Sequence, residues 1–312
     1  MQSRNIAKRL PPASDLDIGA LRIFVAVAEA GSFVGGGKAV GLTRSAAGKA
    51  LTRLENYLGI RLFHRTTRSL SLTTEGHEFY RRSLQLLEDL AEAEASIRQD
   101  QLRPHGTLRL TVSEGYGKAK IIPYLVTYLE TAPDLAVEVS FTDRLVDLVE
   151  EGFDLAIRVG ATAPNGQYIT QVIDRARLGV YASPEYLLKQ GTPASLTDLA
   201  HHKRLVYGLG ATSTVWSLPG EDGQPVTIHG GAHARFDSGD AIRVAALAGL
   251  GIALLPSFIV EKDIEHGDLV EILPETAMNE VTIHAIYPSR RHLSIRTRSF
   301  IEGLRRSFRQ PC

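Results

Sequence analysis

The side chains best placed for chemistry in this chain are the cations and hydroxyls of residues 44 to 53. They lie at helical spacing, opposite an apolar stripe, and comprise Arg44, Ser45, Lys49, Thr52 and Arg53. Arginine and lysine bond the O6 and N7 acceptors of guanine, and hydroxyls bond several bases. Such a face predicts a helix that reads base edges in the major groove of DNA. Arg44, in the first turn of that helix, is the first choice for direct readout.

Two hydroxyl residues mark the starts of two helices joined by a tight turn. Ser32 is suited to cap a short helix over residues 33 to 40, and Thr43 is suited to cap the helix with the cationic face. This order is typical of a helix-turn-helix DNA-binding module, here at about residues 33 to 52. Both capping residues are also expected to contact DNA.

A basic hairpin is predicted directly after these helices. Two short β runs cover residues 61 to 64 and 69 to 72. Arg65 and Arg68 between them are expected to neutralise phosphates, which positions a protein on DNA without specifying sequence. Taken singly, each cation in this region is better explained as a solvated charge. The order and spacing of the whole set favour DNA contact.

Residues 76 to 103 carry a long helical pattern that ends at Pro104. Steps of four and three, typical of a coiled-coil seam, join Phe79, Ser83, Leu86, Leu90, Ala93 and Ile97. A second stripe, suited to pack on the first module, comprises Tyr80, Leu84, Leu87 and Ala91. The pattern indicates a linker helix through which two chains dimerise, chiefly at Phe79, Leu86, Leu90 and Ile97. A single buried amphipathic helix is the alternative.

From residue 104 the pattern changes to strands alternating with helices, which predicts a mostly parallel sheet with helical crossovers. Strands are expected over residues 107–113, 135–141, 154–159, 178–182, 204–207, 252–255 and 281–287, and a last helix over 294–308. In open α/β sheets a ligand binds at strand carboxyl ends, beside helix N-termini. The expected ligand contacts at such junctions are Ser113, Glu114, Gly115, Arg158, Gly160, Tyr207 and Ser238.

Two of these residues predict the chemistry of the ligand. Ser113 and the N–H groups that follow it are suited to hold a small anion, and Arg158 is suited to pair with a carboxylate. An internal ion pair of Arg158 with Asp143 or Asp154 is an equal alternative, and Ser238 is first of all a helix cap. The glycines after Ser113 do not complete a dinucleotide-binding fingerprint, so no nucleotide cofactor is expected.

Charge is divided unevenly along the chain. The 312 residues contain 35 basic and 35 acidic side chains, but residues 1 to 75 carry a net charge of +6 and the remainder carries −6. A basic head on an acidic body gives local attraction to DNA without a polycation. The single cysteine, Cys312, excludes an intrachain disulfide and fits a reducing cytoplasm. Residues 1 to 16 predict a flexible basic tail, with no export signal and no membrane span.

The motifs together resemble the winged helix-turn-helix of the LysR-type transcriptional regulators. The matching residues run from Leu21 to Phe33, then through Arg53-Leu54-Glu55, Leu58-Gly59, Leu62-Phe63, Arg65 and Leu72-Thr73. The resemblance implies an N-terminal all-α winged helix-turn-helix over residues 17 to 75 and a linker helix over 76 to 103. It implies an α/β effector domain over 104 to 308, similar to periplasmic binding proteins. The first subdomain would span about 105–174 and 268–308, and the second about 175–267.

The same resemblance implies partners and location. It implies a cytoplasmic homodimer or homotetramer that binds promoter or operator DNA and responds to a small-molecule effector, for which a small organic acid is expected. No catalytic residue, metal, cofactor or membrane contact is expected. A nucleoid-type protein that binds DNA without a ligand is the alternative. An α/β enzyme would need a nucleophile with a base, and a solute-binding protein has no use for residues 17 to 75.

The glycines of the first module depart from the family pattern. Gly35-Gly36-Gly37 stand where the family has alanines, and Gly48 stands where it often has a serine or threonine that touches DNA. Glycine in a helix interior costs about 1 kcal/mol relative to alanine. Gly36→Ala is therefore expected to raise thermal stability.

Overall fold

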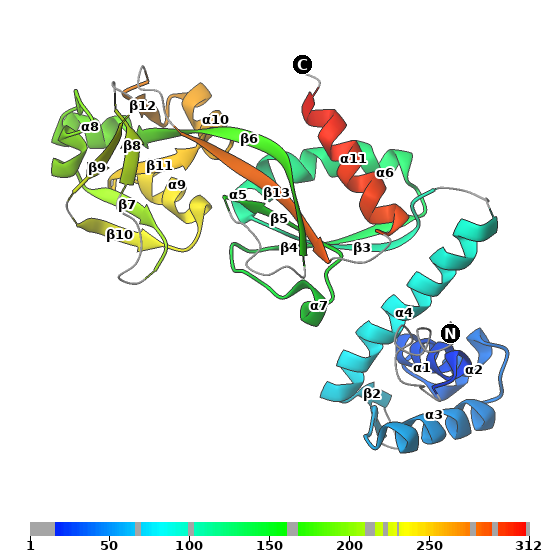
Figure 1. Ribbon diagram of the computed structural model, residues 1–312. Coiled ribbons are helices and arrows are strands. Elements are labelled where there is room, and N and C mark those ends of the chain that lie inside the picture. The colour runs from blue at the N-terminus through cyan, green and yellow to red at the C-terminus, as the bar shows by residue number, and fades with distance from the viewer. Residues whose placement is uncertain are drawn as a thin grey trace, which may run out of the picture. The chain divides into compact units, whose positions relative to one another are not determined.

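The computed structural model divides the chain into two compact units, Met1–Leu102 and Arg103–Cys312, which are described separately (Figure 1). The described residues are 16–65, 70–98, 103–160, 168–209, 216–220, 224–229, 231–274, 279–288 and 293–309. Arg68 and nearly all of the expected basic tail lie outside these ranges.

In the first unit, three short helices surround one apolar core. The helices are α1 (Ile18–Ala30), α2 (Phe33–Ala39) and α3 (Arg44–Leu58). Each begins where a side-chain oxygen accepts an otherwise free N–H of the first turn, and the capping residues are Asp17, Ser32 and Thr43. The caps predicted at Ser32 and Thr43 are confirmed. The core between the helices comprises Phe24, Val25, Val27, Ala47, Leu51, Leu54, Leu62 and Phe63.

A buried carboxylate joins α3 to the hairpin. The hairpin consists of β1 (Phe63–Arg65) and β2 (Leu70–Leu72), paired antiparallel. Glu55 is only 3% exposed, and it accepts the N–H of Leu62 at 2.9 Å and that of Phe63 at 3.3 Å. Arg61 adds an ion pair at 3.4 Å. Because a buried charge is costly unless it is bonded, these contacts fix the chain entering β1 against the end of α3.

The long helix α4 (Thr74–Arg98) packs on this core along one side. Tyr80, Leu84 and Leu87 pack there as the second stripe predicted. Phe79, which is half-buried, also packs there, with its ring centroid 5.2 Å from that of Phe24, so at least part of its surface serves the core of its own chain. Its place in a dimer seam stays a prediction. Leu86 is 56% exposed and Leu90 is half-buried. The side chain of Ile97 lies outside the described part.

The second unit is built on one nine-stranded sheet that two subdomains share (Figure 1). The strand order is β10-β7-β11-β6-β13-β5-β3-β4, with β12 beside β6. The first subdomain holds β3 (Gly106–Val112), β4 (Leu135–Phe141) and β5 (Leu155–Val159). The second holds β7 (Arg204–Tyr207), β10 (Ala232–Phe236), β11 (Ile252–Pro256) and β12 (Val270–Ile272). Two long strands, β6 (Tyr168–Ala182) and β13 (Glu280–Pro288), pair with each other and connect the subdomains. β13 also pairs with β5 of the first subdomain, and the far end of β6 pairs with β11 and β12 of the second.

Helices cover this sheet in both subdomains. The first has α5 (Glu114–Tyr116), a π-helical turn (Gly117–Ile121), α6 (Ile122–Thr131), α7 (Leu148–Glu151) and α11 (Ile295–Arg309). The second has α8 (Pro184–Gln190), a 3-10 turn (Asp198–His201), α9 (Gly239–Leu247) and α10 (Ser257–His266). A separate hairpin is formed by β8 (Trp216–Pro219) and β9 (Pro225–Ile228). Apolar strand residues such as Leu110 and Ile157 pack against Tyr124 and Phe300 of the covering helices.

Two sequence expectations about this unit are corrected. The sheet is mixed rather than mostly parallel, because β13 runs antiparallel to β5 and β6, and β6 runs antiparallel to β11. The expected boundary near residue 268 is too early. β12 pairs with the end of β6, and Ile272 packs in the core of the second subdomain, so the chain returns to the first subdomain only along β13.

The glycines of α2 have a steric reason that the sequence did not reveal. A Cβ at Gly36 would lie 2.4 Å from Cα of Val27 on α1, and one at Gly37 would lie 2.9 Å from the carbonyl oxygen of Leu42. The two helices are therefore closer than alanine allows. The expectation that Gly36→Ala stabilises the protein is wrong, because the gain in helix propensity is smaller than the cost of separating α1 from α2.

We expect Gly36→Ala to lower the free energy of unfolding of the first unit by about 1–3 kcal/mol, as overpacking does. Gly48→Ala on α3 is the matched control: a Cβ there meets nothing within 4 Å, so the same substitution should raise that free energy by about 1 kcal/mol. Urea unfolding of the full chain, followed by circular dichroism, measures both. A stabilised Gly36→Ala variant would contradict the close contact of α1 with α2.

Candidate nucleic-acid interface and ligand site

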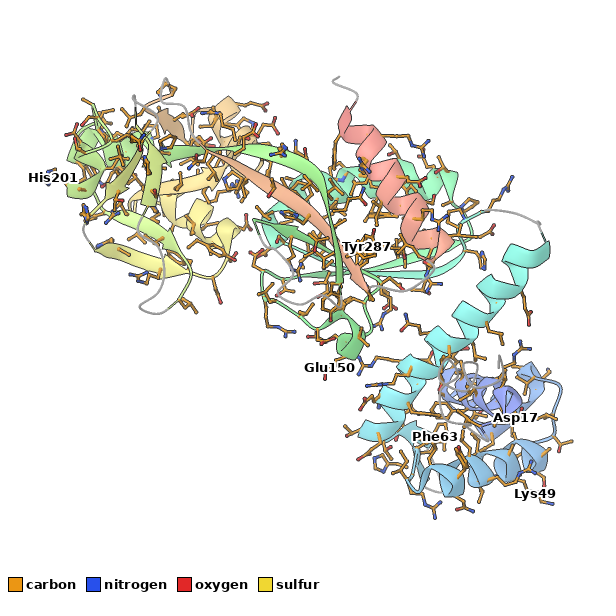
Figure 2. All side chains as sticks on the ribbon, in the orientation of Figure 1. Asp17, Lys49, Phe63, Glu150, His201 and Tyr287 are labelled. Carbon is orange, nitrogen blue, oxygen red and sulfur yellow. The ribbon has the colours of Figure 1, made fainter. Side chains whose placement is uncertain are left out.

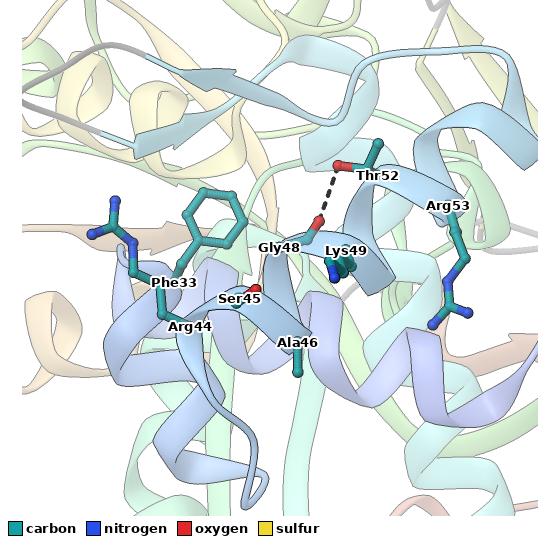
Figure 3. A pocket seen from close by; sticks show the side chains of 8 residues that line it. All are labelled: Phe33, Arg44, Ser45, Ala46, Gly48, Lys49, Thr52 and Arg53. Atoms are coloured by element: carbon teal, nitrogen blue, oxygen red, sulfur yellow. Dashed lines mark hydrogen bonds between the residues drawn. The ribbon is translucent and has the colours of Figure 1, made fainter.

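An open hollow of about 860 Å³ lies on the exposed side of α3 (Figure 3). We call it the α3 hollow. Its lining residues are Phe33, Arg44, Ser45, Ala46, Gly48, Lys49, Thr52 and Arg53. Five of these are the residues that the sequence predicted to face DNA from this helix, and all five are exposed. The structure thus brings the predicted reading face together around one surface depression.

The cations of the α3 hollow are spread along its length. Arg44 and Arg53 lie at opposite ends, with Gly48 and Lys49 between them (Figure 3). Figure 2 shows Lys49 on the outer side of α3, whereas Phe63 is buried among the helices at 4% exposure. Positive charge is therefore presented to solvent on the side away from the core, where it can meet phosphates or guanine edges.

The other predicted DNA contacts lie beside the hollow or outside the described side chains. Ser32 and Thr43 use their hydroxyl oxygens as acceptors for helix caps, at 3.0 and 3.2 Å, and each keeps an O–H that can donate. Arg65 ends β1, but the placement of its side chain is not described, and Arg68 lies outside the described ranges.

In the second unit, the helix N-terminus after β3 already holds a carboxylate of this chain. The N–H of Glu114 donates to Asp143 Oδ1 at 3.3 Å, and Ser113 is buried beside it. Burial raises the pKa of Asp143, while hydrogen bonds from Ser113 and from the N–H groups of Glu114 and Gly239 act in the opposite direction, as does Arg158. The anion expected to occupy this position is therefore replaced, in this structure, by Asp143.

Arg158 is buried, and its hydrogen-bond partners in the described part of the chain are uncharged oxygens. It is 2% exposed and donates to Thr111 Oγ1 at 2.7 Å and to the carbonyl oxygens of Ile157 and Arg144 at 3.2 Å. Among the residues that the structure describes, none offers it a carboxylate oxygen within 4.0 Å, so neither expected ion pair forms; Asp154 pairs with Arg296 instead. Burial lowers the pKa of Arg158, and the field of Asp143 partly offsets this.

Polar contacts join the two subdomains close to these residues. Ser238 Oγ caps α9 by accepting the N–H of Ala241, as predicted, and also donates to Glu114 Oε2 at 2.9 Å. Lys118 Nζ lies 2.9 Å from Glu114 and 2.8 Å from Asp240. Glu114 and Lys118 belong to the first subdomain, and Ser238 and Asp240 belong to the second. These contacts hold the subdomains together at the ends of two facing helices.

The π-helical turn supplies a second lysine for this junction. Lys120, two residues after Lys118, pairs with Glu261 of α10 at 3.4 Å. Sequence reasoning missed both lysines, although the spacing of Glu114 and Lys118 by four residues indicated a helical ion pair. Gly115 has a packing role here, since a Cβ would lie 2.9 Å from Ile259.

The remaining predicted ligand residues lie at strand ends. Gly160 follows β5 with φ of 68°, a conformation that favours glycine, and its N–H donates to the carbonyl of Thr282. Tyr207 ends β7 and is 47% exposed, and its pKa is raised by burial and by Asp143 and Asp237. Four of the predicted ligand residues therefore lie near the junction of the two subdomains, together with Asp143: Ser113, Glu114, Arg158 and Ser238.

Two further observations concern ligands and membranes. Within the described ranges, no three His, Cys, Asp or Glu side chains are grouped so that they could hold a metal ion. No helix there combines the length and the apolar character needed to cross a membrane.

Comparison with known proteins agrees with this two-part organisation. The family described as bacterial regulatory helix-turn-helix protein, lysR family, matches residues 18–77, and the LysR substrate binding domain matches residues 101–309. An uncharacterized HTH-type transcriptional regulator of Haemophilus influenzae is 36% identical over 279 residues, covering 89% of this chain and 96% of that protein. The HTH-type transcriptional regulator CrgA of Neisseria meningitidis is 33% identical, covering 91% of this chain and 94% of that protein.

Solved structures show the same architecture. The structure of CrgA, a LysR-type transcriptional regulator from Neisseria meningitidis, aligns with a TM-score of 0.60 and a sequence identity of 30%. The alignment covers 95% of this chain and 100% of the CrgA chain. The full-length virulence activator AphB of Vibrio cholerae aligns with a TM-score of 0.55 and 26% identity over 93% and 98% of the two chains. The head built on α1 to α3, the long helix and the two-subdomain α/β unit are those of one family: the chain belongs to the LysR-type transcriptional regulators.

Proposed function

We propose that this regulator binds promoter or operator DNA with α3 in the major groove, and that a small effector between the two subdomains controls the binding. The observation that carries the proposal is the α3 hollow, around which Arg44, Lys49 and Arg53 are exposed on one face. The net charge of +6 on residues 1 to 75 supports it, because phosphate neutralisation supplies much of the affinity for DNA. DNA as the target also favours a cytoplasmic location.

We place the effector beside Arg158, Ser113 and Ser238. A small organic acid fits this chemistry, since Arg158 is bonded to uncharged oxygens and a carboxylate would balance its charge. Such an acid has to enter where Asp143 now accepts the N–H of Glu114. Binding would therefore rearrange the contacts that join the subdomains.

The effector would act by shifting a population of subdomain angles. Each polar contact at the junction is partly exposed and individually weak, so a ligand with modest preference for one angle is enough to change the balance. We infer that two chains pair through α4, with Leu86 and Leu90 in the seam, so that the subdomain angle sets the spacing of two DNA-binding heads. The alternative is a protein that binds DNA without control by a ligand. The experiments below would distinguish it from the proposed regulator.

The first test is binding of the full-length protein to the DNA upstream of its own gene, with scrambled DNA as competitor and a salt titration. Binding that resists the competitor is expected. Arg44→Ala should then lose about 1–3 kcal/mol of binding free energy and relax the preference at one base pair. Arg22→Ala is the control, because Arg22 is an exposed cation of the same unit outside the α3 hollow. Equal binding to scrambled DNA would refute site-specific recognition.

Lys118→Met should shift the subdomains toward a more open angle, because it removes the cation between Glu114 and Asp240. Spin labels at Val126 and Leu188, which are 63% and 88% exposed in different subdomains, would report the change as a longer distance once Cys312 is replaced. Lys189→Met is the matched control, since Lys189 forms an ion pair with Glu185 of its own helix, α8. An unchanged distance distribution would exclude Lys118 from closure.

Replacement of Leu86 and Leu90 together by aspartate should convert dimers to monomers, because two charges cannot be buried in an apolar seam without a partner. Sedimentation velocity measures the outcome. Leu188→Asp, at an exposed position of α8, is the control and should leave the association state unchanged. Intact dimers in the double variant would show that the chains associate elsewhere.

A further inference from the structure

At the centre of the α3 hollow stands a residue without a side chain. Gly48 lies in the interior of α3, and a Cβ built on it would meet nothing within 4 Å. This distinguishes it from Gly36, where Val27 is 2.4 Å away, and from Gly76, where the carbonyl of Leu62 is 2.0 Å away. Close packing explains those two glycines and does not explain Gly48.

Glycine at this position has a cost within the helix. An interior glycine lowers helix stability about fivefold relative to alanine. Gly48 does not have the positive φ that favours glycine at turns such as Gly41 and Gly59. The open space above its Cα distinguishes Gly48 from the closely packed Gly36 and Gly76, and that space is part of the α3 hollow.

The hollow is lined by apolar groups as well as by cations, and one of these cations, Lys49, lies next to Gly48. Phe33 and Ala46 line it beside Gly48, and Arg44 and Arg53 lie at its two ends (Figure 3). The carbonyl of Gly48 accepts the hydroxyl of Thr52 at 2.9 Å, so that hydroxyl is engaged within the helix. The space directly above Gly48 is thus suited to receive a small nonpolar group, with Lys49 and the two arginines available for the surrounding phosphates and base edges.

In a DNA major groove, the nonpolar group that projects from a base edge is the 5-methyl of thymine, and alanine, phenylalanine and threonine methyl groups are its usual contacts. We propose that the α3 hollow receives a thymine methyl group and that Gly48 determines this specificity by leaving the space free. The inference rests on the proposed DNA binding and adds to it the identity of one base pair.

The test replaces each thymine of the protected site by uracil, which removes only the methyl group. With the full-length wild-type protein, one thymine per half-site should show a loss of affinity of about fourfold, the effect of one buried methyl group. Gly48→Leu fills the hollow, so it should bind the thymine site at least about tenfold more weakly and should no longer distinguish thymine from uracil.

Folding is measured separately in the same variants. Gly48→Leu should slow amide hydrogen exchange in α3, because leucine is a better helix former than glycine. Asn56→Leu is the matched control: Asn56 is exposed on the same helix but does not line the hollow, so this variant should keep both the affinity and the preference for thymine. A stabilised helix with weakened binding is a combination that loss of structure does not produce.

The outcomes separate this inference from the proposed function. If the wild-type protein shows no preference for any DNA site, the proposed function fails. If it binds specifically but no thymine-to-uracil change reduces affinity, or if Gly48→Leu binds like the wild type, the assignment of the hollow to a thymine methyl group is overturned while the proposed function stands.

Discussion

The antiparallel pairing of β6 with β13 is the constraint on which the second unit depends. β13 pairs with β6 from Glu280 opposite Arg177 to Pro288 opposite Tyr168, and it also pairs with β5 of the first subdomain. The far end of β6 pairs with β11 and β12 of the second subdomain. The two subdomains cannot separate from each other without breaking the pairing of β6 with β13. The motion that remains available is bending or twisting of these two continuous strands. Weak contacts such as Ser238 with Glu114 can then select an angle, because the ladder already supplies the connection.

In the first unit, glycine has two opposite structural roles. Gly36 lets α1 and α2 approach until a single methyl group would collide with Val27. Gly48 leaves α3 without a side chain where nothing in the chain fills the space. Glu55 adds a further constraint, since its buried carboxylate ties the chain before β1 to the same helix. α3 is therefore fixed in position from its inner side and left open on its outer side.

Much of this architecture was predictable because it follows from local patterns. Capping hydroxyls, the apolar stripe of α3 and the alternation of strands and helices gave the right elements, and the cations of α3 do share one surface. What depends on contacts between distant residues was not predictable. Neither the packing of Phe79 on Phe24 nor the place of β12 beside β6 follows from spacing. Short strands such as β8 and β10 carry too few residues for a clear period.

The position of Asp143 was the least predictable part of the candidate ligand site and has the largest consequence. A helix N-terminus attracts any nearby anion, and the sequence does not say whether that anion is a ligand or a side chain brought by a distant loop. Here Asp143 accepts the N–H of Glu114, and burial raises the pKa of its carboxyl group. An acidic effector of the kind proposed must displace this carboxylate or share the site with it, and two carboxylates close together repel. The net free energy of effector binding would thereby be reduced, but displacing Asp143 would change its electrostatic surroundings in both subdomains, because the N–H of Gly239 in the second acts to lower its pKa. On the proposed function, an internal anion of this kind would couple occupancy of the site to the subdomain angle, which is the differential contact that a ligand-controlled switch requires.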